Sequence, residues 1–400
     1  MKIGIDASTW VNRRGYGRFT RGLVNAMVTG FPQHAYTLVI DDTMANEPTF
    51  PPGVTLRVVR TSERQTTAAS ADGSRRAIDV LRMGRAASRL DLDVFLFPTN
   101  YSFFPFWSRT PTVTVFHDAT AELLPSLIFP NIVPRTLWRI KSLLALRQSA
   151  QLVTVSDDAR TQITRVFGRA AGDIEVVSEG TDPAFSPLHD ALERTRVSAA
   201  VRTRFRLPSD TPLLLYVGGI SPHKNIDGLL RAIATLDRTR RPCHLVIVGD
   251  LSDDNFLTCY DELRLLVAER SLIEHVTFTG FVEDADLVAL YQAATMLVLP
   301  SMSEGCGLRV REALACGLPV AVSNRFSLPE IVGDAGRLFD PTSDDDIASA
   351  LRQLLGDGAL RAAMSARGLV RAEAYSWGRG AQTMMRILER VVTHREAHGQ

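Results

Sequence analysis

The 400-residue sequence predicts an α/β protein with two domains, each built on a doubly wound parallel β-sheet. Three observations indicate this class. The length exceeds what one hydrophobic core usually organises. Short apolar runs rich in β-branched residues alternate with longer amphipathic stretches, as expected for parallel strands alternating with helices. The most distinctive polar and glycine-rich segments directly follow apolar runs, and ligands bind at that end of strands in open α/β sheets.

Eleven apolar runs are expected to be strands, in two groups that each form one sheet. A helix is expected from about residue 18 to residue 27, and an amphipathic helix over residues 377–394. The expected strands are residues 3–7, 37–40, 94–97, 112–116, 152–155 and 174–177 in the first group, and 213–217, 245–248, 276–278, 296–299 and 320–322 in the second.

The join between the two groups is expected near residues 183–212, where prolines surround a charged helical segment. We therefore expect a first domain over residues 1–190 and a second over residues 191–375.

Composition excludes several classes of protein. The counts of Lys+Arg (45) and Asp+Glu (44) nearly cancel, so nucleic acid is not an expected partner. The four cysteines form no C-x-x-C pair, which favours a reducing compartment over a disulfide framework or a zinc site. No signal peptide and no run of 18 apolar residues occurs, so we expect a cytoplasmic protein. No His/Cys/carboxylate cluster has metal-ligand spacing, so we expect no metal.

Residues 301–320 carry the strongest functional signal. The apolar run 296–300 leads into a glycine-broken loop and then a helix that should end at Gly317. The start of such a helix offers backbone N–H groups and a positive dipole end to an anion. Glu304 and Glu312, eight positions apart, can accept bonds from sugar hydroxyls. Together they predict a sugar-nucleotide site, with two solvated carboxylates as the plain alternative.

A second motif follows the expected strand 213–217. Gly218 and Gly219 form a turn, Lys224 can reach a phosphate as a point charge, and Asn225 stands where it can cap the next helix. The alternative is a solvated lysine before a helix.

The first domain contributes weaker signals, again after strands. Gly15 and Gly17 would let the backbone approach a ligand closely, although they do not form the G-x-G-x-x-G pattern and can equally mark a tight turn. His117 ends a strand, where the alternative is a structural histidine bonded to Asp118. Glu179 also follows a strand and either shapes a ligand site or belongs to a simple turn.

Residues 137–147 mix apolar, aromatic and basic side chains at helical spacing. Such a helix can rest on an anionic membrane surface, which would make the protein peripheral at the cytoplasmic face of a membrane. The alternative is a core face with a solvated basic edge.

Taken together, the motifs resemble the signature of retaining family 4 glycosyltransferases with the GT-B fold. Residues 304–312 match the E-x(7)-E pattern, and Gly317-Leu318-Pro319 follows it. The other motifs stand in the family's order along almost the whole chain. The resemblance implies two Rossmann-like domains facing a central cleft, the second of which binds the nucleotide sugar. It also implies that a C-terminal helix, residues 376–400, packs back on the first domain.

The resemblance also implies roles for individual residues. Glu304 would bond the donor sugar, Glu312 the ribose, and Lys224 the diphosphate. His117 would lie near the anomeric carbon or the 6-hydroxyl of the sugar. We expect His117, Lys224 and Glu304 to be catalytic. The donor-binding residues are expected to be Gly15, Gly17, Gly218, Gly219, Lys224, Glu304, Cys306, Gly307, Leu308 and Glu312.

Three departures from the family pattern affect the expected chemistry. Gly219 occupies the position of a frequent arginine, for which Arg18 or Arg309 would have to substitute. Cys306 and Arg309 replace an aromatic residue and a proline. The lysine motif resembles that of mannose-transferring members, which favours GDP-mannose as donor, with no separate cofactor. The expected acceptor is a growing polysaccharide or a lipid-linked oligosaccharide. A GT-B nucleotide-sugar epimerase and a non-catalytic partner subunit remain as alternatives.

Overall fold

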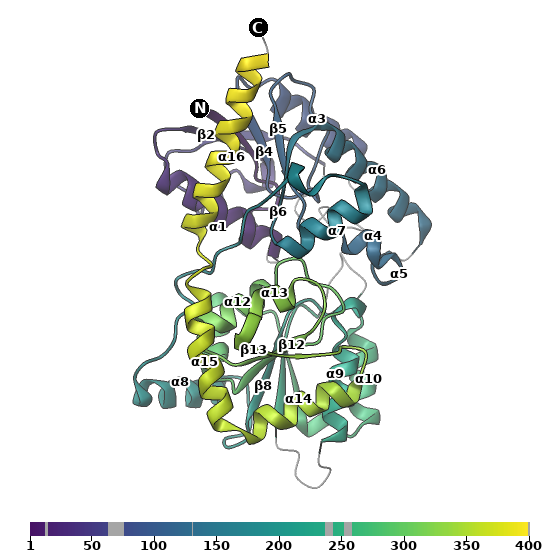
Figure 1. Cartoon of the computed structure of the whole chain (residues 1–400), viewed down its shortest axis with the longest axis vertical. Helices are drawn as coiled ribbons and strands as arrows, with labels where there is room; N and C mark the ends of the chain where they lie inside the picture. The colour runs from purple at the N-terminus through teal and green to yellow at the C-terminus, as the bar shows by residue number, and fades with distance from the viewer. Residues whose placement is uncertain (13–14, 63–75, 130, 237–242, 252–257, 399–400) are drawn as a thin grey trace. The chain divides into compact units, whose positions relative to one another are not determined.

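The computed structural model describes residues 1–12, 15–62, 76–129, 131–236, 243–251 and 258–398. The chain forms two compact units (Figure 1): unit 1 is Met1–Gly180 together with Ser376–Gln400, and unit 2 is Thr181–Tyr375. The join at Gly180 precedes the prolines that marked it in the sequence, and residues 183–212 belong to unit 2. The fold class predicted from the sequence, two Rossmann-like units with parallel sheets, is confirmed.

Unit 1 is built on a seven-stranded parallel sheet in the order β3-β2-β1-β4-β5-β6-β7. Its strands are β1 (Lys2–Asp6), β2 (Ala35–Asp41), β3 (Thr55–Val59), β4 (Val94–Phe97), β5 (Thr112–Val115), β6 (Ser149–Thr154) and β7 (Ile174–Val176). Its α-helices are α1 (Gly15–Gly30), α3 (Ala77–Ser88), α4 (Thr120–Leu123), α5 (Pro125–Ile128), α6 (Ile132–Gln148), α7 (Asp157–Phe167) and α16 (Trp377–His398). Short 3-10 helices are η1 (Asp42–Met44) and η2 (Ala171–Asp173).

Unit 2 is built on a six-stranded parallel sheet in the order β10-β9-β8-β11-β12-β13. Its strands are β8 (Leu213–Val217), β9 (His244–Val248), β10 (Val276–Gly280), β11 (Met296–Leu299), β12 (Val320–Ser323) and β13 (Gly336–Phe339). Its α-helices are α8 (Ala191–Arg204), α9 (Ile226–Thr235), α10 (Tyr260–Glu269), α11 (Asp284–Ala293), α12 (Leu308–Ala315), α13 (Leu328–Val332), α14 (Asp344–Gly356) and α15 (Gly358–Ala372). Short 3-10 helices are η3 (Pro222–Lys224), η4 (Ile273–His275) and η5 (Gly333–Ala335).

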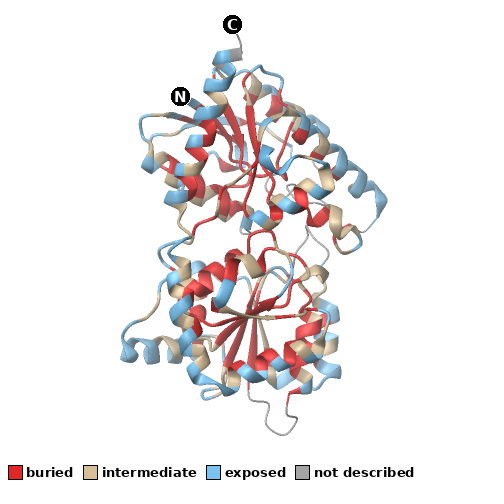
Figure 2. Cartoon of the chain, viewed as in Figure 1, coloured by how far each residue is buried: buried red, intermediate tan, exposed pale blue. Residues whose placement is uncertain are grey.

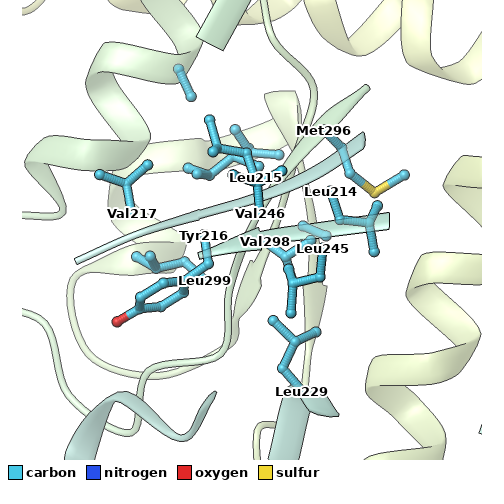
Figure 3. Close-up of a cluster of buried hydrophobic side chains, with 14 of the residues drawn as sticks. Leu214, Leu215, Tyr216, Val217, Leu229, Leu245, Val246, Met296, Val298 and Leu299 are labelled. Carbon is cyan, nitrogen blue, oxygen red and sulfur yellow. The ribbon is translucent and has the colours of Figure 1, made fainter. Parts of the chain in front are cut away.

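The central strands of each sheet are buried on both faces, as their continuous apolar sequences predict (Figure 2). In unit 2, side chains of β8, β9 and β11 and Leu229 of α9 belong to one hydrophobic core (Figure 3). This packing holds the ends of β8 and β11, from which the candidate site is built.

All eleven strands expected from the sequence are present, within a few residues at their ends. Two further strands, β3 and β13, were not predicted, and both lie at sheet edges. An edge strand is partly solvated, so β3 carries the exposed Arg57 and β13 begins at Gly336. Neither therefore forms the apolar run that marked the central strands.

The C-terminal helix α16 packs against α1 in unit 1. At its start, the Trp377 ring covers Gly22, where an added Cβ would lie 2.2 Å from the ring. A Cβ on Gly180 would lie 2.1 Å from the Trp377 backbone nitrogen. Along the helix, Arg390 and Glu175 form an ion pair at 2.5 Å. Glycines at two crossing points thus let α16 complete unit 1.

Within the described ranges, none of the helices combines the length and the apolar character needed to cross a bilayer. All four cysteines are free thiols.

Candidate functional site

The loop after β11 leads into α12 through Gly307, whose φ of +59° lies in the left-handed region. A Cβ at this position would also lie 2.6 Å from Ile331 Cδ1, so both backbone and packing require glycine. Among the described residues, no side chain caps α12. The first N–H groups of such a helix have no partner within it, and they lie at its positive dipole end.

The other end of α12 is fixed by the predicted Gly317, with φ +69°. The Gly317 N–H donates to Leu314 O (3.0 Å) and the Leu318 N–H to Ala313 O (2.9 Å). These two bonds form a Schellman motif, which ends the helix. The helix therefore has both of its boundaries set by glycines of the sequence motif.

Lys224 and Glu304, from separate motifs, meet in unit 2. The Lys224 ammonium donates to Glu304 Oε1 at 2.6 Å, and Ser301 Oγ donates to the same oxygen at 2.9 Å. Both charged side chains are 17% exposed. Among the described residues, nothing else bonds the Lys224 ammonium or Glu304 Oε2. The pair therefore keeps two N–H donors and one carboxylate oxygen for a ligand.

Asn225, which follows Lys224 in the chain, fixes the turn that carries it. Its backbone is left-handed, with φ 55°, and its Nδ2 donates to Pro300 O (3.2 Å) and Pro341 O (2.7 Å). The sequence placed Asn225 correctly before α9, but its side chain makes no capping bond to that helix. The amide instead ties the turn to the segments that follow β11 and β13.

Tyr216 fixes the Gly218–Gly219 turn, because its hydroxyl donates to Gly219 O at 2.8 Å. Burial, and then the nearby Glu304 carboxylate, raise the pKa of Tyr216 well above its ordinary value. The phenol therefore remains a proton donor. Gly218 is close-packed, since an added Cβ would lie 2.8 Å from the Tyr216 hydroxyl. For Gly219, apart from its neighbours in the chain, the nearest atom of the described residues to an added Cβ is Ser221 Oγ at 3.9 Å, so the position has room.

Glu312 is 1% exposed and lies in a buried network. Arg309 Nη1 donates to both carboxylate oxygens, at 3.1 and 2.9 Å, and the Tyr291 hydroxyl donates at 2.9 Å. Burial, the largest single effect, lowers the pKa of Arg309, but Glu312, Tyr291 and Asp284 together raise it by more, so the pKa lies above its ordinary value. Arg309, one of the two candidates to replace the missing arginine, thus pairs with Glu312 in this structure, and its contact with a diphosphate stays a prediction. Binding of a ribose by Glu312 stays a prediction.

His117 follows β5 in unit 1 and is 5% exposed. Its Nε2 lies 3.0 Å from Pro98 O and its Nδ1 lies 3.4 Å from Glu179 Oε1. Its partner is therefore Glu179, not Asp118, whose carboxylate accepts a bond from the Thr120 N–H at 2.8 Å. His117 and Glu179, which the sequence analysis considered as two unrelated candidates, are therefore in contact in the structure.

Aromatic rings surround His117. Tyr16 and Phe19 of α1 present their edges or faces to the imidazole, with ring centroids at 5.3 and 4.7 Å. Between them on the helix, Gly17 packs so closely that a Cβ would lie 1.9 Å from Asn12 O. Apart from its neighbours in the chain, no described residue lies within 4 Å of the Cβ position of Gly15. The two glycines of the predicted motif therefore differ: one is required for packing and one is open.

Sequence reasoning missed a second cluster in unit 1, around Glu122. The Trp138 indole N–H donates to Glu122 Oε1 at 2.7 Å, and the Trp138 ring packs on Tyr101. Burial raises the pKa of Glu122 to about 7, although the Trp138 bond lowers it. Tyr101 also stacks on Tyr16, at a centroid distance of 4.2 Å, which links this cluster to the surroundings of His117. In the sequence, the helical spacing that includes Trp138 was the one indication of this cluster.

Over the residues that the structure describes, no three His, Cys, Asp or Glu side chains form a group that could hold a metal ion. Metal-independent chemistry stays a prediction.

The comparisons with known proteins fit this geometry. The family model "Glycosyltransferase Family 4" matches residues 14–185, and "Glycosyl transferases group 1" matches residues 198–370. The chain belongs to glycosyltransferase family 4. The two matches divide this family 4 chain close to the boundary between its two units.

Curated relatives of the family 4 chain include the O-antigen chain mannosyltransferase B of Escherichia coli, 35% identical over 66% of this chain and 66% of that protein. The D-inositol 3-phosphate glycosyltransferase of Kineococcus radiotolerans is 33% identical over 62% of this chain and 58% of its own length. The serotype-specific mannosyltransferase WbdA of Escherichia coli is 26% identical over 68% of this chain and 32% of its own length. The match thus spans between about a third and about two thirds of these relatives.

Solved structures confirm the GT-B fold. A sucrose-phosphate synthase from Thermosynechococcus elongatus superposes with a TM-score of 0.78, at 20% identity, over 98% of this chain and 100% of that one. WaaG, a glycosyltransferase of lipopolysaccharide biosynthesis, superposes with a TM-score of 0.74 at 16% identity, over 96% of this chain and 99% of that one.

Proposed function

We propose that this chain is a retaining glycosyltransferase that moves a sugar from a nucleotide-diphosphate donor to an acceptor hydroxyl without a metal ion. The observation that carries the proposal is the Lys224–Glu304 pair, with unused donors and an unused acceptor, in the same unit as the open N-terminus of α12. A diphosphate needs cationic and N–H donors, whereas a sugar hydroxyl needs an acceptor. The pair provides both chemistries side by side.

Departure of the nucleoside diphosphate would build negative charge on its phosphate oxygens. Lys224 and the first N–H groups of α12 would stabilise this charge, and a fixed donor of this kind is worth about 100-fold or more in rate. Glu304 would orient the sugar through its hydroxyls. Since no side chain is proposed as a covalent nucleophile, we propose a front-face displacement in which the leaving phosphate takes the acceptor proton.

For the donor we propose GDP-mannose, and for the acceptor a growing polysaccharide or a lipid-linked oligosaccharide. The support is that two relatives of this chain carry mannosyltransferase names, one of them an O-antigen chain enzyme. A nucleotide-sugar epimerase and a non-catalytic partner subunit are the rival functions, and the absence of the arginine at position 219 supports the latter.

The first test is thermal unfolding with GDP, UDP, ADP, dTDP and their common sugar conjugates, with and without Mg²⁺. A ligand at about 100 times its Kd adds roughly 2.7 kcal/mol to the folded state, so we expect one nucleotide to raise Tm visibly. Transfer is then measured with that donor. Lys224→Ala and Glu304→Gln should each lower the transfer rate about 100-fold, whereas Lys2→Ala, which breaks an exposed pair with Asp91, should not.

The rival functions predict other outcomes. An epimerase would convert the donor without any acceptor, which NMR of the sugar detects. A non-catalytic subunit would turn over no donor. Wild-type transfer rates in both Lys224→Ala and Glu304→Gln would contradict the proposed site, and an inverted anomeric configuration of the product would contradict the retaining mechanism.

A further inference from the structure

The turn after β8 has glycine at position 219, where related chains often carry an arginine. A diphosphate bears negative charge on both phosphates, and one ammonium group balances only part of it. Of the two arginines considered as substitutes, Arg18 lies on α1 in unit 1 and Arg309 pairs with Glu312. A further donor on the turn itself would complete the site.

His223, the residue before Lys224 in η3, lies close to the position of the missing side chain. Its Nδ1 is 3.2 Å from Ser221 Oγ, and the same Oγ is 3.9 Å from the Cβ position of Gly219. The two distances together place Nδ1 at most about 7 Å from that Cβ position. An extended arginine carries its terminal nitrogens about 6 Å from its Cβ. The imidazole therefore stands in the region that an arginine at position 219 could reach.

The backbone of His223 is bonded to the segment that leads from β11 into α12. The Met302 N–H donates to His223 O at 2.8 Å. One residue further along the turn, Lys224 bonds Glu304 of the same segment at 2.6 Å. The turn that carries the imidazole is thus attached to the loop that opens α12, whose first N–H groups belong to the proposed donor site.

The Ser221 hydroxyl decides which ring nitrogen of His223 carries a proton. Ser221 is buried, and within the described part of the chain His223 Nδ1 is the one hydrogen-bond partner of its Oγ. A buried hydroxyl proton without an acceptor is costly, so the hydroxyl donates to Nδ1 and the ring proton stands on Nε2. In this tautomer the neutral imidazole is already an N–H donor.

We propose that His223 binds the donor diphosphate together with Lys224, in place of the missing arginine. Glu304, which would hold the sugar, bonds Lys224, so the phosphate at this turn is the one attached to the sugar. The Nε2–H of His223 would donate to an oxygen of that phosphate. The inference rests on the proposed function, and it removes the support that position 219 gives to a non-catalytic subunit.

The test is calorimetric titration of the full chain with GDP, UDP, ADP and dTDP, and then with the monophosphate of the nucleotide that binds most tightly. His223→Phe keeps a ring and removes the N–H donor. We expect about tenfold weaker binding of the diphosphate and a much smaller loss for the monophosphate, which lacks the phosphate concerned. His223→Gln, whose amide can replace the Nε2–H, should recover most of the affinity.

Gly219→Arg provides a rescue experiment. Since its guanidinium and the imidazole would bind the same phosphate, it should strengthen diphosphate binding more in the His223→Phe background than in the wild type. Gly219→Gln in that background should not. The matched control is His189→Phe, which alters an exposed histidine of unit 2 and should bind the diphosphate like the wild type.

Thermal unfolding shows whether each variant folds, and His223→Ala replaces His223→Phe if the latter does not. The inference is overturned if the variant binds the diphosphate like the wild type or loses di- and monophosphate equally. It is also overturned if Gly219→Arg adds the same factor in both backgrounds. A wild type that binds none of the four nucleotides would instead contradict the proposed function, and this inference with it.

Discussion

The residues assigned to ligand binding are held differently in the two units. In unit 2, Lys224 and Glu304 are partly exposed and keep donors and an acceptor that no described residue uses. In unit 1, His117 has oxygen acceptors at both ring nitrogens and is enclosed by Tyr16 and Phe19, and Gly17 is in contact with the backbone of Asn12. The predicted site residues of unit 2 thus keep free hydrogen-bonding groups, whereas those of unit 1 are closely packed.

This difference separates two kinds of constraint. A residue with unused hydrogen-bonding capacity can be altered with little effect on folding, so its loss should appear in ligand binding. A residue packed on all sides contributes to the free energy of unfolding, so its loss should appear there first. We therefore expect substitutions in unit 1 to act through stability and substitutions around Lys224 to act through the donor.

The glycines of α1 provide the largest expected effect. Gly17→Ala would place a methyl group 1.9 Å from Asn12 O and should lower the unfolding free energy by about 3 kcal/mol. Gly15→Ala meets no neighbour and should be neutral or stabilising by about 0.5 kcal/mol. Urea denaturation of both variants measures the difference. Equal stability of the two would contradict the packing described for unit 1.

Glu122 should give unit 1 a pH dependence. Its pKa is raised from 4.5 to about 7 because it is buried, so between these values the unfolded chain binds fewer protons than the folded one. Stability therefore falls as pH rises through this window, by on the order of 3 kcal/mol for this group.

Glu122→Gln removes the charge and keeps an acceptor for Trp138. Denaturation at both ends of the window should show a smaller loss in this variant than in the wild type. Parallel curves for the two proteins would mean that Glu122 titrates normally.

Asn225 should affect both stability and donor binding, because it is buried and directly follows Lys224 in the chain. Asn225→Ala leaves the Pro300 and Pro341 carbonyls without their donor and puts alanine at φ 55°, which should cost about 2 to 3 kcal/mol. The apparent KM for the donor should also rise.

Asn225→Gly tolerates the left-handed backbone and should lose only the two bonds, so the alanine variant should be the less stable one by about 1 kcal/mol. A normal KM in both variants would show that Asn225 does not position Lys224.

Gly219→Arg should have the smallest effect, and it should strengthen nucleotide binding instead of weakening it. The position is open, and a guanidinium there would face the proposed diphosphate, which should tighten nucleotide binding about fivefold. Gly219→Gln, which adds length without charge, is the control. Binding that is unchanged, or equal in the two variants, would argue against a diphosphate at this turn.

Local patterns were sufficient to predict most of the fold. Buried strands such as β8 and β11 are continuous apolar runs, so their existence and their parallel pairing could be read directly. The edge strands β3 and β13 could not, because solvent on one side allows polar residues into them. The boundaries of α12 were predictable because glycines at 307 and 317 set both ends.

Site residues were predictable where one short motif contained them and unpredictable where tertiary packing joined them. Glu304 and Glu312 were found by their spacing. Tyr291, which donates to Glu312 from 21 positions earlier, carried no signal. The pairing of His117 with Glu179 joins residues far apart in sequence and depends on the sheet order of unit 1. The Arg309–Glu312 contact, three residues apart on a helix, was visible in principle.

The return of α16 to unit 1 has a consequence for how the protein is made. Everything from Thr181 to Tyr375 is translated between the two parts of unit 1, whereas unit 2 is contiguous in sequence. Domains generally fold as they leave the ribosome. Unit 2 can therefore reach its native state while α1 still exposes the surface around Gly22 that Trp377 will cover. We expect nascent unit 1 to be the part of the polypeptide that needs chaperone protection.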